Sequence, residues 1–452
     1  MKKYILALTA ILLSTAFLSA QTASATINSG DTAWMLVATV LVLFMSIPGL
    51  ALFYGGLVRR KNVLSIFMQV FVIVAVISIE WVAIGYSNAF GSNSIDWLEP
   101  FIGGFDWAFL KGIKQTDLSP YFISHSQIAA DGSDIGTIPH LVFVMFQGMF
   151  AVITPALIIG AFAERINFKG FLLFSVLWAV LIYNPVAHWV WSGDGWLLAL
   201  GALDYAGGTV VHVNAGIAAI VMALLMGKRR DYKGHALPPH NITYVAIGAA
   251  MLWVGWFGFN AGSGLAADGL AGNALMVTNL TAATAALTWA ILEWIIDKKP
   301  TVVGVSTGAV GGLVAITPAA GFVSVGGAIA IGVIVTVVCF IMVAYVKPKL
   351  GYDDSLDAFG IHGIGGILGA ILTGVFATPF IQEGISGALY GNFYQLWIQL
   401  LATIITLIFS GVGTFILFKI TDKLVGIRAT DKQEAVGLDE TLHRETAYTS
   451  FD

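Results

Sequence analysis

Long apolar stretches separated by short polar connections run through most of the chain. Eleven of them contain about 17 to 25 mainly apolar residues, the length that a helix needs to cross a hydrocarbon core of roughly 30 Å. They cover approximately residues 34–58, 64–90, 139–162, 170–191, 205–226, 243–260, 274–296, 301–317, 325–346, 359–378 and 394–420. The pattern predicts an all-α integral membrane protein with eleven transmembrane helices in a domain over residues 31–420.

The first 25 residues follow a different pattern. Lys2 and Lys3 precede the apolar run 5–18, which is followed by small-residue sites at LSA (18–20) and ASA (23–25). This order is typical of a signal peptide over residues 1–25, with cleavage after residue 20 or 25. The alternative is an uncleaved anchor helix, which the short apolar run disfavours, since a span needs about 20 residues. Cleavage would leave the mature N-terminus outside the membrane.

Lys and Arg are distributed unevenly among the connections between the predicted spans. Of the 22 basic residues, only Lys111 and Lys114 fall beyond the signal peptide and on the side of the mature N-terminus. The others lie in the opposite connections and in the C-terminal tail. Because cytoplasmic connections carry an excess of Lys and Arg, this asymmetry predicts an outside N-terminus and a cytoplasmic C-terminus. Both ends agree with an odd number of spans.

The composition excludes several classes of function. Hydrophobic residues make up 58% of the chain and charged residues 11%, and the mean hydropathy is +0.85, so the apolar surface requires lipid. A net charge of −4 without a dense basic patch argues against nucleic-acid binding. Cys339 is the only cysteine, which excludes an intramolecular disulfide and a thiol-ligated metal cluster. We expect neither a cofactor nor a metal.

Two longer polar segments and a glycine pattern complete the organisation. The connection 91–138 is rich in Gly, Asp and Ser, and we expect an external loop with little regular structure. The tail 421–452 is polar and of mixed charge, which predicts a cytoplasmic segment that can be mobile until it binds a partner. Glycines at small-xxx-small spacing, such as Gly304, Gly308 and Gly312, let helices approach closely in lipid and favour a compact bundle.

Two histidines lie inside apolar spans, where a polar group is costly. They are His212 in DYAGGTVVHVNAG (204–216) and His362 in DAFGIHGIGG (357–366), each preceded by an Asp and a glycine-rich turn. Such residues usually face a cavity, a pathway or a partner; the alternative is two buried histidines bonded to backbone carbonyls. Because they fall on spans five and ten, the second group of five spans would be inverted relative to the first. Inverted repeats build central pathways from matching helices.

Aromatic residues gather at the outer ends of several predicted spans. They are Phe146 and Phe150 in FQGMF, Trp191, and Trp256 and Phe259 in WVGWFGFNAGS, which ends at Ser263. Taken singly, each is as readily explained as a residue of the interfacial aromatic belt. Interruption by Gly, Asn and Ser suits the wall of a vestibule better. Since indole faces attract cations and a Ser hydroxyl accepts hydrogen bonds, the group would suit a small cationic N–H donor.

At these residues the sequence resembles the Amt ammonium transporter family of the Amt/Mep/Rh superfamily, and it is similar to its bacterial members. The likeness covers nearly the whole mature chain. The motifs that carry it are IPGLALFYGGLVRRKNVLS (47–65), FQGMFAVITPALIIGAFAERINF (146–168), DYAGGTVVH (204–212), GWFGFNAGS (255–263) and DAFGIHG (357–363), together with the tail segment EAVGLDETLHRETAY (434–448).

The resemblance implies a homotrimer in the bacterial inner membrane, in which each protomer has its own pore and a five-plus-five inverted repeat. It implies an outer ammonium site, a gate, paired pore imidazoles and a supporting carboxylate. The outer site would consist of Phe150, Trp191 and Ser263, with Phe146 and Trp256 nearby. The gate would be Phe150 and Phe259, the pore imidazoles His212 and His362, and the supporting carboxylate Asp204. It also implies regulation by a cytoplasmic PII-type signalling protein that binds the tail.

Glu80, deep in the second span, departs from the apolar residue that this resemblance leads us to expect. An unpaired carboxylate there would cost several kcal/mol. Its role is open, and a subunit interface is one possibility.

Potassium and ammonium ions are close in size, so we expect selection by deprotonation: ammonium can cross as ammonia, whereas potassium cannot lose its charge. Three alternatives stay open. An ammonium receptor would share the site, a neutral-gas or water channel would share the apolar lumen, and a metalloenzyme would need further ligands at coordination spacing.

Overall fold

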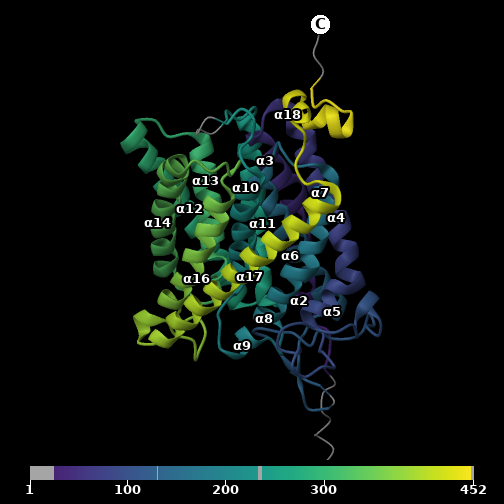
Figure 1. Cartoon of the computed structure of the whole chain (residues 1–452). Coiled ribbons are helices and arrows are strands. Elements are labelled where there is room, and N and C mark those ends of the chain that lie inside the picture. The colour runs from purple at the N-terminus through teal and green to yellow at the C-terminus, as the bar shows by residue number, and fades with distance from the viewer. Residues whose placement is uncertain (1–24, 130, 233–236, 449–452) are drawn as a thin grey trace, which may run out of the picture.

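The computed structural model describes residues 25–129, 131–232 and 237–448. Except for its last residue, the predicted signal peptide lies outside the described residues. Long helices run side by side through one bundle, and α17 crosses the others obliquely (Figure 1).

The helical elements follow one another in chain order, and several long helices contain a single π-helical turn (η1, η3, η5, η6, η8 and η9). In the first half they are α2 (Ser29–Phe44), η1 (Met45–Gly49), α3 (Leu50–Leu57), η2 (Arg60–Asn62), α4 (Val63–Glu80), η3 (Trp81–Gly85), α5 (Tyr86–Phe90), η4 (Ala108–Leu110), α6 (His140–Phe162), α7 (Phe168–Trp178), η5 (Ala179–Tyr183), α8 (Asn184–Trp191), α9 (Trp196–Ala199), η6 (Gly208–Val213) and α10 (Asn214–Met226). In the second half they are α11 (Ile242–Ala261), η7 (Gly262–Gly264), α12 (Gly269–Asp297), α13 (Val302–Ile316), α14 (Val325–Ile341), η8 (Met342–Val346), α15 (Lys347–Leu350), η9 (Phe359–Gly363), α16 (Ile364–Phe376), η10 (Ala388–Tyr390), α17 (Phe393–Val425), α18 (Asp431–Val436) and η11 (Asp439–His443).

Ten helical segments of the described chain are long and apolar enough to cross a membrane, and each coincides with one of the predicted stretches. The eighth predicted stretch corresponds to α13, which is apolar but only 15 residues long. This helix ends at Ile316, two residues before Pro318, which has no N–H group to continue the helical hydrogen bonds. The helical membrane-type architecture therefore agrees with the prediction. Of the eleven helical segments that coincide with the predicted stretches, α13 is the shortest.

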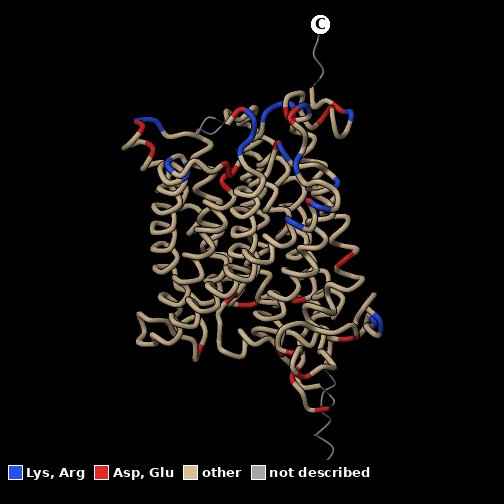
Figure 2. Tube along the Cα trace, in the orientation of Figure 1, with Lys and Arg blue, Asp and Glu red and all other residues tan. Residues whose placement is uncertain are grey.

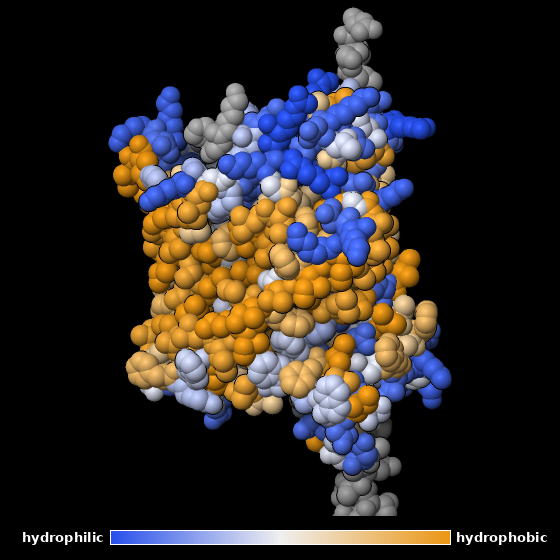
Figure 3. Space-filling view, in the orientation of Figure 1, coloured by the Kyte–Doolittle hydropathy of each residue, from blue (hydrophilic) through white to orange (hydrophobic). Residues whose placement is uncertain are grey.

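The surface is divided into an apolar belt and two polar ends (Figure 3). Lys and Arg gather at the end that carries α18, whereas the opposite end carries the connection 91–138 (Figure 2). We call these the tail end and the loop end. The apolar belt lies at the height of the long helices, as expected for a surface solvated by lipid tails.

The connection at the loop end is largely irregular, as its composition predicts. It contains the 3₁₀ turn η4 and one short antiparallel hairpin, in which β1 (Gln127–Ile128) pairs with β2 (Asp134–Ile135). The register pairs Gln127 with Ile135.

Buried ion pairs fasten the connections at the tail end. The Arg229 guanidinium lies 2.8 Å from Glu164 Oε2 and 2.8 Å from Asp353 Oδ1, and Arg59 Nε lies 3.0 Å from Glu164 Oε1. The Glu164 and Asp353 side chains are fully buried. Burial by itself would raise the pKa of Glu164, but Arg229 and Arg59 hold it below its ordinary value. The network joins four separate segments of the chain at one point.

The described part of the tail is helical and packs against this end of the bundle. Arg428 pairs with Glu434 at 2.8 Å, and Lys61 Nζ donates to the backbone carbonyls of Glu434 and Ala435. Asp439 accepts hydrogen bonds from the backbone N–H groups of Leu64 and Ser65. The tail is thus fastened to the connection between α3 and α4.

Replacing Glu164 by Ala should destabilise the tail end strongly. The substitution leaves the buried charge of Arg229 only partly paired and leaves Arg59 with only the half-exposed Asp231, and breaking a buried pair costs about 3–5 kcal/mol. The measurement is the thermal unfolding midpoint in detergent. Asp231→Ala is the matched control, because Asp231 pairs with the same Arg59 but is half exposed, so its loss should cost about 0–1 kcal/mol. Equal midpoints for the two variants would contradict the assignment of the stability to buried pairs.

Candidate functional site

Three cavities follow one another between the two ends of the bundle. The loop-end vestibule has a volume of about 460 Å³ and the tail-end vestibule about 120 Å³. Between them lies a central cavity of about 10 Å³, which is room for roughly one water-sized molecule. The central cavity and the tail-end vestibule share His362 and Tyr54 as wall residues. The arrangement is that of a narrow pathway with a wide mouth at each end.

The wall of the loop-end vestibule includes Phe150, Trp191, Asp204 and Ser263. The Trp191 indole N–H donates to the backbone carbonyl of Asp204 at 2.9 Å, which fixes the orientation of the ring, and the ring stands perpendicular to Phe150 at 5.6 Å. The Ser263 hydroxyl donates to the Phe259 carbonyl at 2.8 Å. Because its proton is committed there, the hydroxyl oxygen keeps its lone pairs for a donor in the vestibule.

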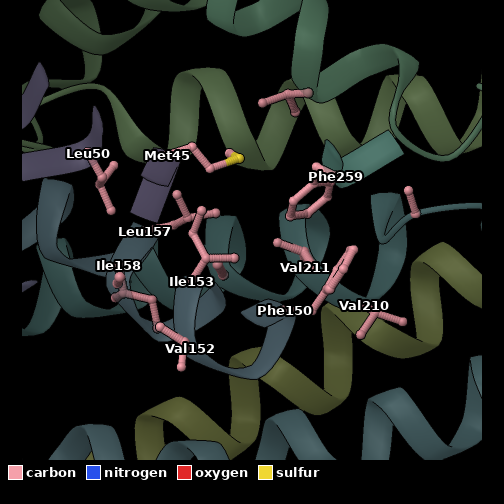
Figure 4. Close-up of a cluster of buried hydrophobic side chains, with 14 of the residues drawn as sticks. Met45, Leu50, Phe150, Val152, Ile153, Leu157, Ile158, Val210, Val211 and Phe259 are labelled. Carbon is pink, nitrogen blue, oxygen red and sulfur yellow. The ribbon is translucent and has the colours of Figure 1, made fainter. Parts of the chain in front are cut away.

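Two phenylalanine rings separate this vestibule from the central cavity. The ring centroids of Phe150 and Phe259 lie 4.2 Å apart, and both side chains are at most 1% exposed (Figure 4). Phe150 belongs to the wall of the vestibule and Phe259 to the wall of the central cavity. Passage between the two spaces therefore requires these rings to move.

The wall of the central cavity is mainly apolar, and its polar groups are two imidazoles together with Tyr54 and Trp256, whose O–H and N–H groups are bonded to other protein atoms. The rings of His212 and His362 stack at 5.3 Å with an interplanar angle of 23°, and they are 1% and 4% exposed. Both ring nitrogens of His212 and Nδ1 of His362 are buried and make no hydrogen bond with any described residue. Unpartnered buried nitrogens are rare because they forfeit hydrogen bonds to water. Here they are available to a small polar molecule in the cavity.

Asp204 holds the start of the helix that carries His212. Its carboxylate accepts four backbone hydrogen bonds of 2.6–3.1 Å, from Gly207, Gly208, Thr209 and Val210. These are the N–H groups that a helix start leaves unpaired. The chain turns into the helix through Gly207, whose φ of +110° disfavours any residue with a side chain. Burial raises the pKa of Asp204, while the four N–H donors act in the opposite direction.

A second carboxylate, which the sequence analysis missed, does the same for His362. Asp354 accepts hydrogen bonds from Ala358 N and Phe359 N, at the start of η9. It precedes His362 by the same number of residues by which Asp204 precedes His212. Burial raises the pKa of Asp354 to about 6. This equal spacing is the signal in the sequence that identifies Asp354. The Asp of the motif DAFGIHG is Asp357, which lines the tail-end vestibule and pairs with Lys347 at 2.5 Å.

The structure places the other two aromatic candidates behind or below the vestibule wall. Phe146 packs edge-on against Phe150 at 5.0 Å and supports it. Trp256 lines the central cavity, where its ring stacks on His212 at 5.5 Å and its N–H donates to Thr317 at 2.9 Å. The helical phase of α11 explains this depth, because Trp256 lies two turns before Ser263 along the chain.

The two histidine-bearing helices approach each other through glycines. A Cβ atom on Gly216 would lie 2.2 Å from the Cα atom of Gly363, and one on Gly366 would lie 2.9 Å from the Cβ atom of His212. Real Cβ atoms do not come so close to backbone, so only glycine permits this crossing. The imidazole stacking depends on it.

Glu80 does not point toward an exposed face. The side chain is 8% exposed, and its Oε1 accepts a hydrogen bond from Asn184 Nδ2 at 2.9 Å within the same chain. These contacts lie within one chain, and a place for Glu80 at a subunit interface stays a prediction. Gly85 makes the space for the carboxyl group, because a Cβ atom there would lie 2.8 Å from Glu80 Oε1.

These features define a class of protein: a multi-pass helical membrane protein with a narrow, mostly apolar pathway through a single chain. Comparison with known proteins identifies the family. The model of the Ammonium Transporter Family matches residues 33–448, so the chain belongs to that family.

An ammonium transporter of Bacillus subtilis is 51% identical over 421 residues, which cover 93% of this chain and 98% of the relative. The crystal structure of Saccharomyces cerevisiae Mep2 superimposes with a TM-score of 0.80 at 35% identity, covering 90% of this chain and 88% of Mep2. A solved structure described as a sensor Amt protein gives a TM-score of 0.80 at 27% identity, covering 92% of this chain and 98% of that one. The relatives are named for transport and sensing rather than for catalysis.

Substitution of Gly216 by Ala should destabilise the protein and separate the imidazoles, because the new methyl group has no space beside Gly363. Such overpacking costs about 1–3 kcal/mol. The thermal unfolding midpoint measures the loss. Gly272→Ala is the control, since Gly272 lies in the helix α12 with open space around it and should gain up to about 1 kcal/mol. A Gly216→Ala variant as stable as wild type would show that the helices can separate without cost.

Proposed function

We propose that the protein takes up ammonium at the loop-end vestibule, removes a proton, and passes ammonia through the central cavity. The observation that carries the proposal is the small, mainly apolar central cavity with two stacked imidazoles, three of whose buried nitrogens have no hydrogen-bond partner among the described residues. A cavity of that size has no room for an ion with its hydration shell. It does have room for one neutral molecule that needs hydrogen-bond partners.

Recruitment uses the aromatic and hydroxyl groups of the loop-end vestibule. The Trp191 and Phe150 rings present π faces that attract a cation, with a contribution of about 2 kcal/mol where water is excluded. Ser263 accepts a hydrogen bond from an N–H group of the ion. Phe146 supports the Phe150 ring, and Trp256 contributes one level deeper. Asp204 acts at a distance, because its oxygens are occupied by backbone N–H groups.

Selection follows from the cost of desolvating a charge. An unpaired ion in a medium of low dielectric constant costs tens of kcal/mol by an idealised estimate, so an ammonium ion is driven to lose its proton. Potassium has no proton to lose and stays outside. The Phe150 and Phe259 rings open only transiently, which keeps water out of the central cavity. His212 and His362 then bond ammonia or relay the proton.

The placement in the membrane is part of the proposal. The eleven apolar helices, α13 included, are transmembrane spans of the domain over residues 31–420, and the equal placement of Asp204 and Asp354 ahead of their histidines supports a five-plus-five inverted repeat. The cluster of Lys and Arg makes the tail end cytoplasmic in a bacterial inner membrane (Figure 2). Residues 1–25 form a cleaved signal peptide, three protomers assemble, and the tail over residues 421–452 receives a PII-type protein.

A second candidate is an ammonium receptor on the same fold. The similarity to a sensor Amt protein favours it, since that structure shares the whole architecture. A neutral-gas channel is a third, because the lumen is apolar. A receptor would use the cation-attracting wall around Trp191 without the cavity lined by the paired imidazoles, and a neutral-gas channel would use the apolar lumen without that wall. Transport of ammonium is the preferred function because it uses both.

Replacement of both His212 and His362 by Ala should abolish selective ammonium transport. Each buried hydrogen bond contributes on the order of 1–1.5 kcal/mol, so the loss of two lowers the flux roughly 30- to 160-fold. The measurement is ammonium flux into proteoliposomes. His240→Ala is the control, because His240 bonds Val58 and Tyr448 and does not line the three cavities. Unchanged ammonium-specific flux in the double variant would remove the imidazoles from the mechanism.

Uptake of methylammonium into proteoliposomes should be inhibited by ammonium and unaffected by potassium, because only the former can be deprotonated. The electrical current across the proteoliposome membrane is recorded during uptake. A current shows that the released proton crosses with the ammonia, and no current shows that it stays outside. Equal inhibition by both ions would contradict the selection mechanism. Binding of ammonium without any flux would favour the receptor.

A further inference from the structure

A single histidine at the loop end lies between two carboxylates that belong to different elements. His125 Nδ1 is 3.1 Å from Asp31 Oδ2, and His125 Nε2 is 3.6 Å from Asp268 Oδ2. The His125 side chain is 41% exposed, so protons reach it from solvent. Neither His125 nor these two carboxylates lines a cavity of the pathway.

Each carboxylate is fixed by other contacts. Asp31, on α2, accepts hydrogen bonds from the Thr137 hydroxyl at 2.6 Å and from Ala267 N at 2.9 Å. Asp268 caps α12 by accepting from Ala271 N through Oδ1, which leaves Oδ2 for His125. The imidazole is therefore the movable member of a junction among α2, the connection 91–138, and the turn that precedes α12.

This junction fastens one wall of the loop-end vestibule. Residues 120–123 line the vestibule, and Ser124, between them and His125, donates its hydroxyl to the Gly264 carbonyl at 3.4 Å. Gly264 follows Ser263, and Leu265 lines the same space. Movement of the segment around His125 would change the wall that faces the proposed ammonium site.

The protonation state of His125 decides how many of its two contacts are favourable. A neutral imidazole has one N–H group, so one of its nitrogens must present a lone pair to a carboxylate, whereas the imidazolium donates to both. Bonds between charged partners are also about twice as strong as neutral ones. The charged groups that face the ring are Asp31 on α2 and Asp268 at the start of α12, and beyond Asp268 lies the hydroxyl of Tyr205. Among the described residues, no Lys or Arg pairs with either carboxylate.

We propose that His125 is a positioning residue that fastens the vestibule wall when it is protonated and releases one side of it when neutral. Histidine side chains change charge between about pH 5 and 8, within the range that an external surface experiences. The apparent affinity for ammonium is then higher in acid, where the wall is held at both carboxylates. This consequence rests on the proposed transport function, whereas the fastening itself does not.

The transport test compares variants of the full chain in proteoliposomes at external pH values from about 5.5 to 8, below the range in which ammonium itself titrates. The ratio of the wild-type KM for ammonium to that of His125→Gln should rise roughly three- to tenfold from about pH 5.5 to pH 8. This factor is smaller than the full contribution of one charge-assisted hydrogen bond. The kcat values should stay parallel. Asp268→Asn keeps an oxygen for the α12 cap and should remove the pH dependence as His125→Gln does. Asp134→Asn, an exposed position of β2 in the same connection, should keep it.

A second measurement reads the fastening without transport. Hydrogen–deuterium exchange of peptides covering residues 118–128, compared between wild type and His125→Gln at the same pH, should show greater protection in wild type near pH 5.5 and no difference near pH 8. Identical exchange in the two proteins at both pH values would overturn the proposal, even if transport is normal. A difference in exchange in a protein that moves no ammonium would instead count against the proposed function and leave the fastening in place.

Discussion

The free-energy cost of a charge in a narrow apolar space governs the whole pathway. Between the two vestibules the chain leaves about 10 Å³, bounded by aliphatic and aromatic side chains and two imidazoles. Such a space cannot supply the shell of dipoles that water provides to an ion. Lys and Arg correspondingly gather at the tail end (Figure 2). Among the described residues, the ionisable groups that line the central cavity are the stacked rings of His212 and His362 and the phenol of Tyr54, all of which can be neutral.

The imidazoles are held in place by the backbone that precedes them and not by hydrogen bonds to the rings. Asp204 and Asp354 each gather the unpaired N–H groups at the start of a π-helical turn, and the turn carries a histidine into the cavity. The carboxylates stay outside the apolar section, and their charge is balanced by backbone dipoles. Close packing at Gly216 and Gly363 then brings the two turns together.

The two polar ends are stabilised by different kinds of interaction. At the tail end, fully buried ion pairs around Glu164 and Arg229 join distant segments, and the C-terminal tail bonds to the connection after α3. At the loop end the connection is long and irregular, and side-chain bonds such as those of His125 and Thr137 to Asp31 hold its position.

The sequence by itself determined the membrane class and the approximate spans. A helix must be long and apolar to cross lipid, and this property depends only on consecutive residues. It also singled out His212 and His362, since ionisable groups at membrane depth are expensive unless they have a role, and Trp191 and Ser263, since they belong to an aromatic and hydroxyl group that suits a cation. It did not find Asp354, and it grouped Trp256 with the vestibule, although the ring lies one level deeper beside His212. Only the tertiary structure decided that the rings of His212 and His362 stack, that Phe150 meets Phe259, and that Glu80 faces Asn184. Those contacts join residues far apart in the chain, and their distances are set by how helices cross, which depends on the shapes of many side chains at once and not on any local pattern.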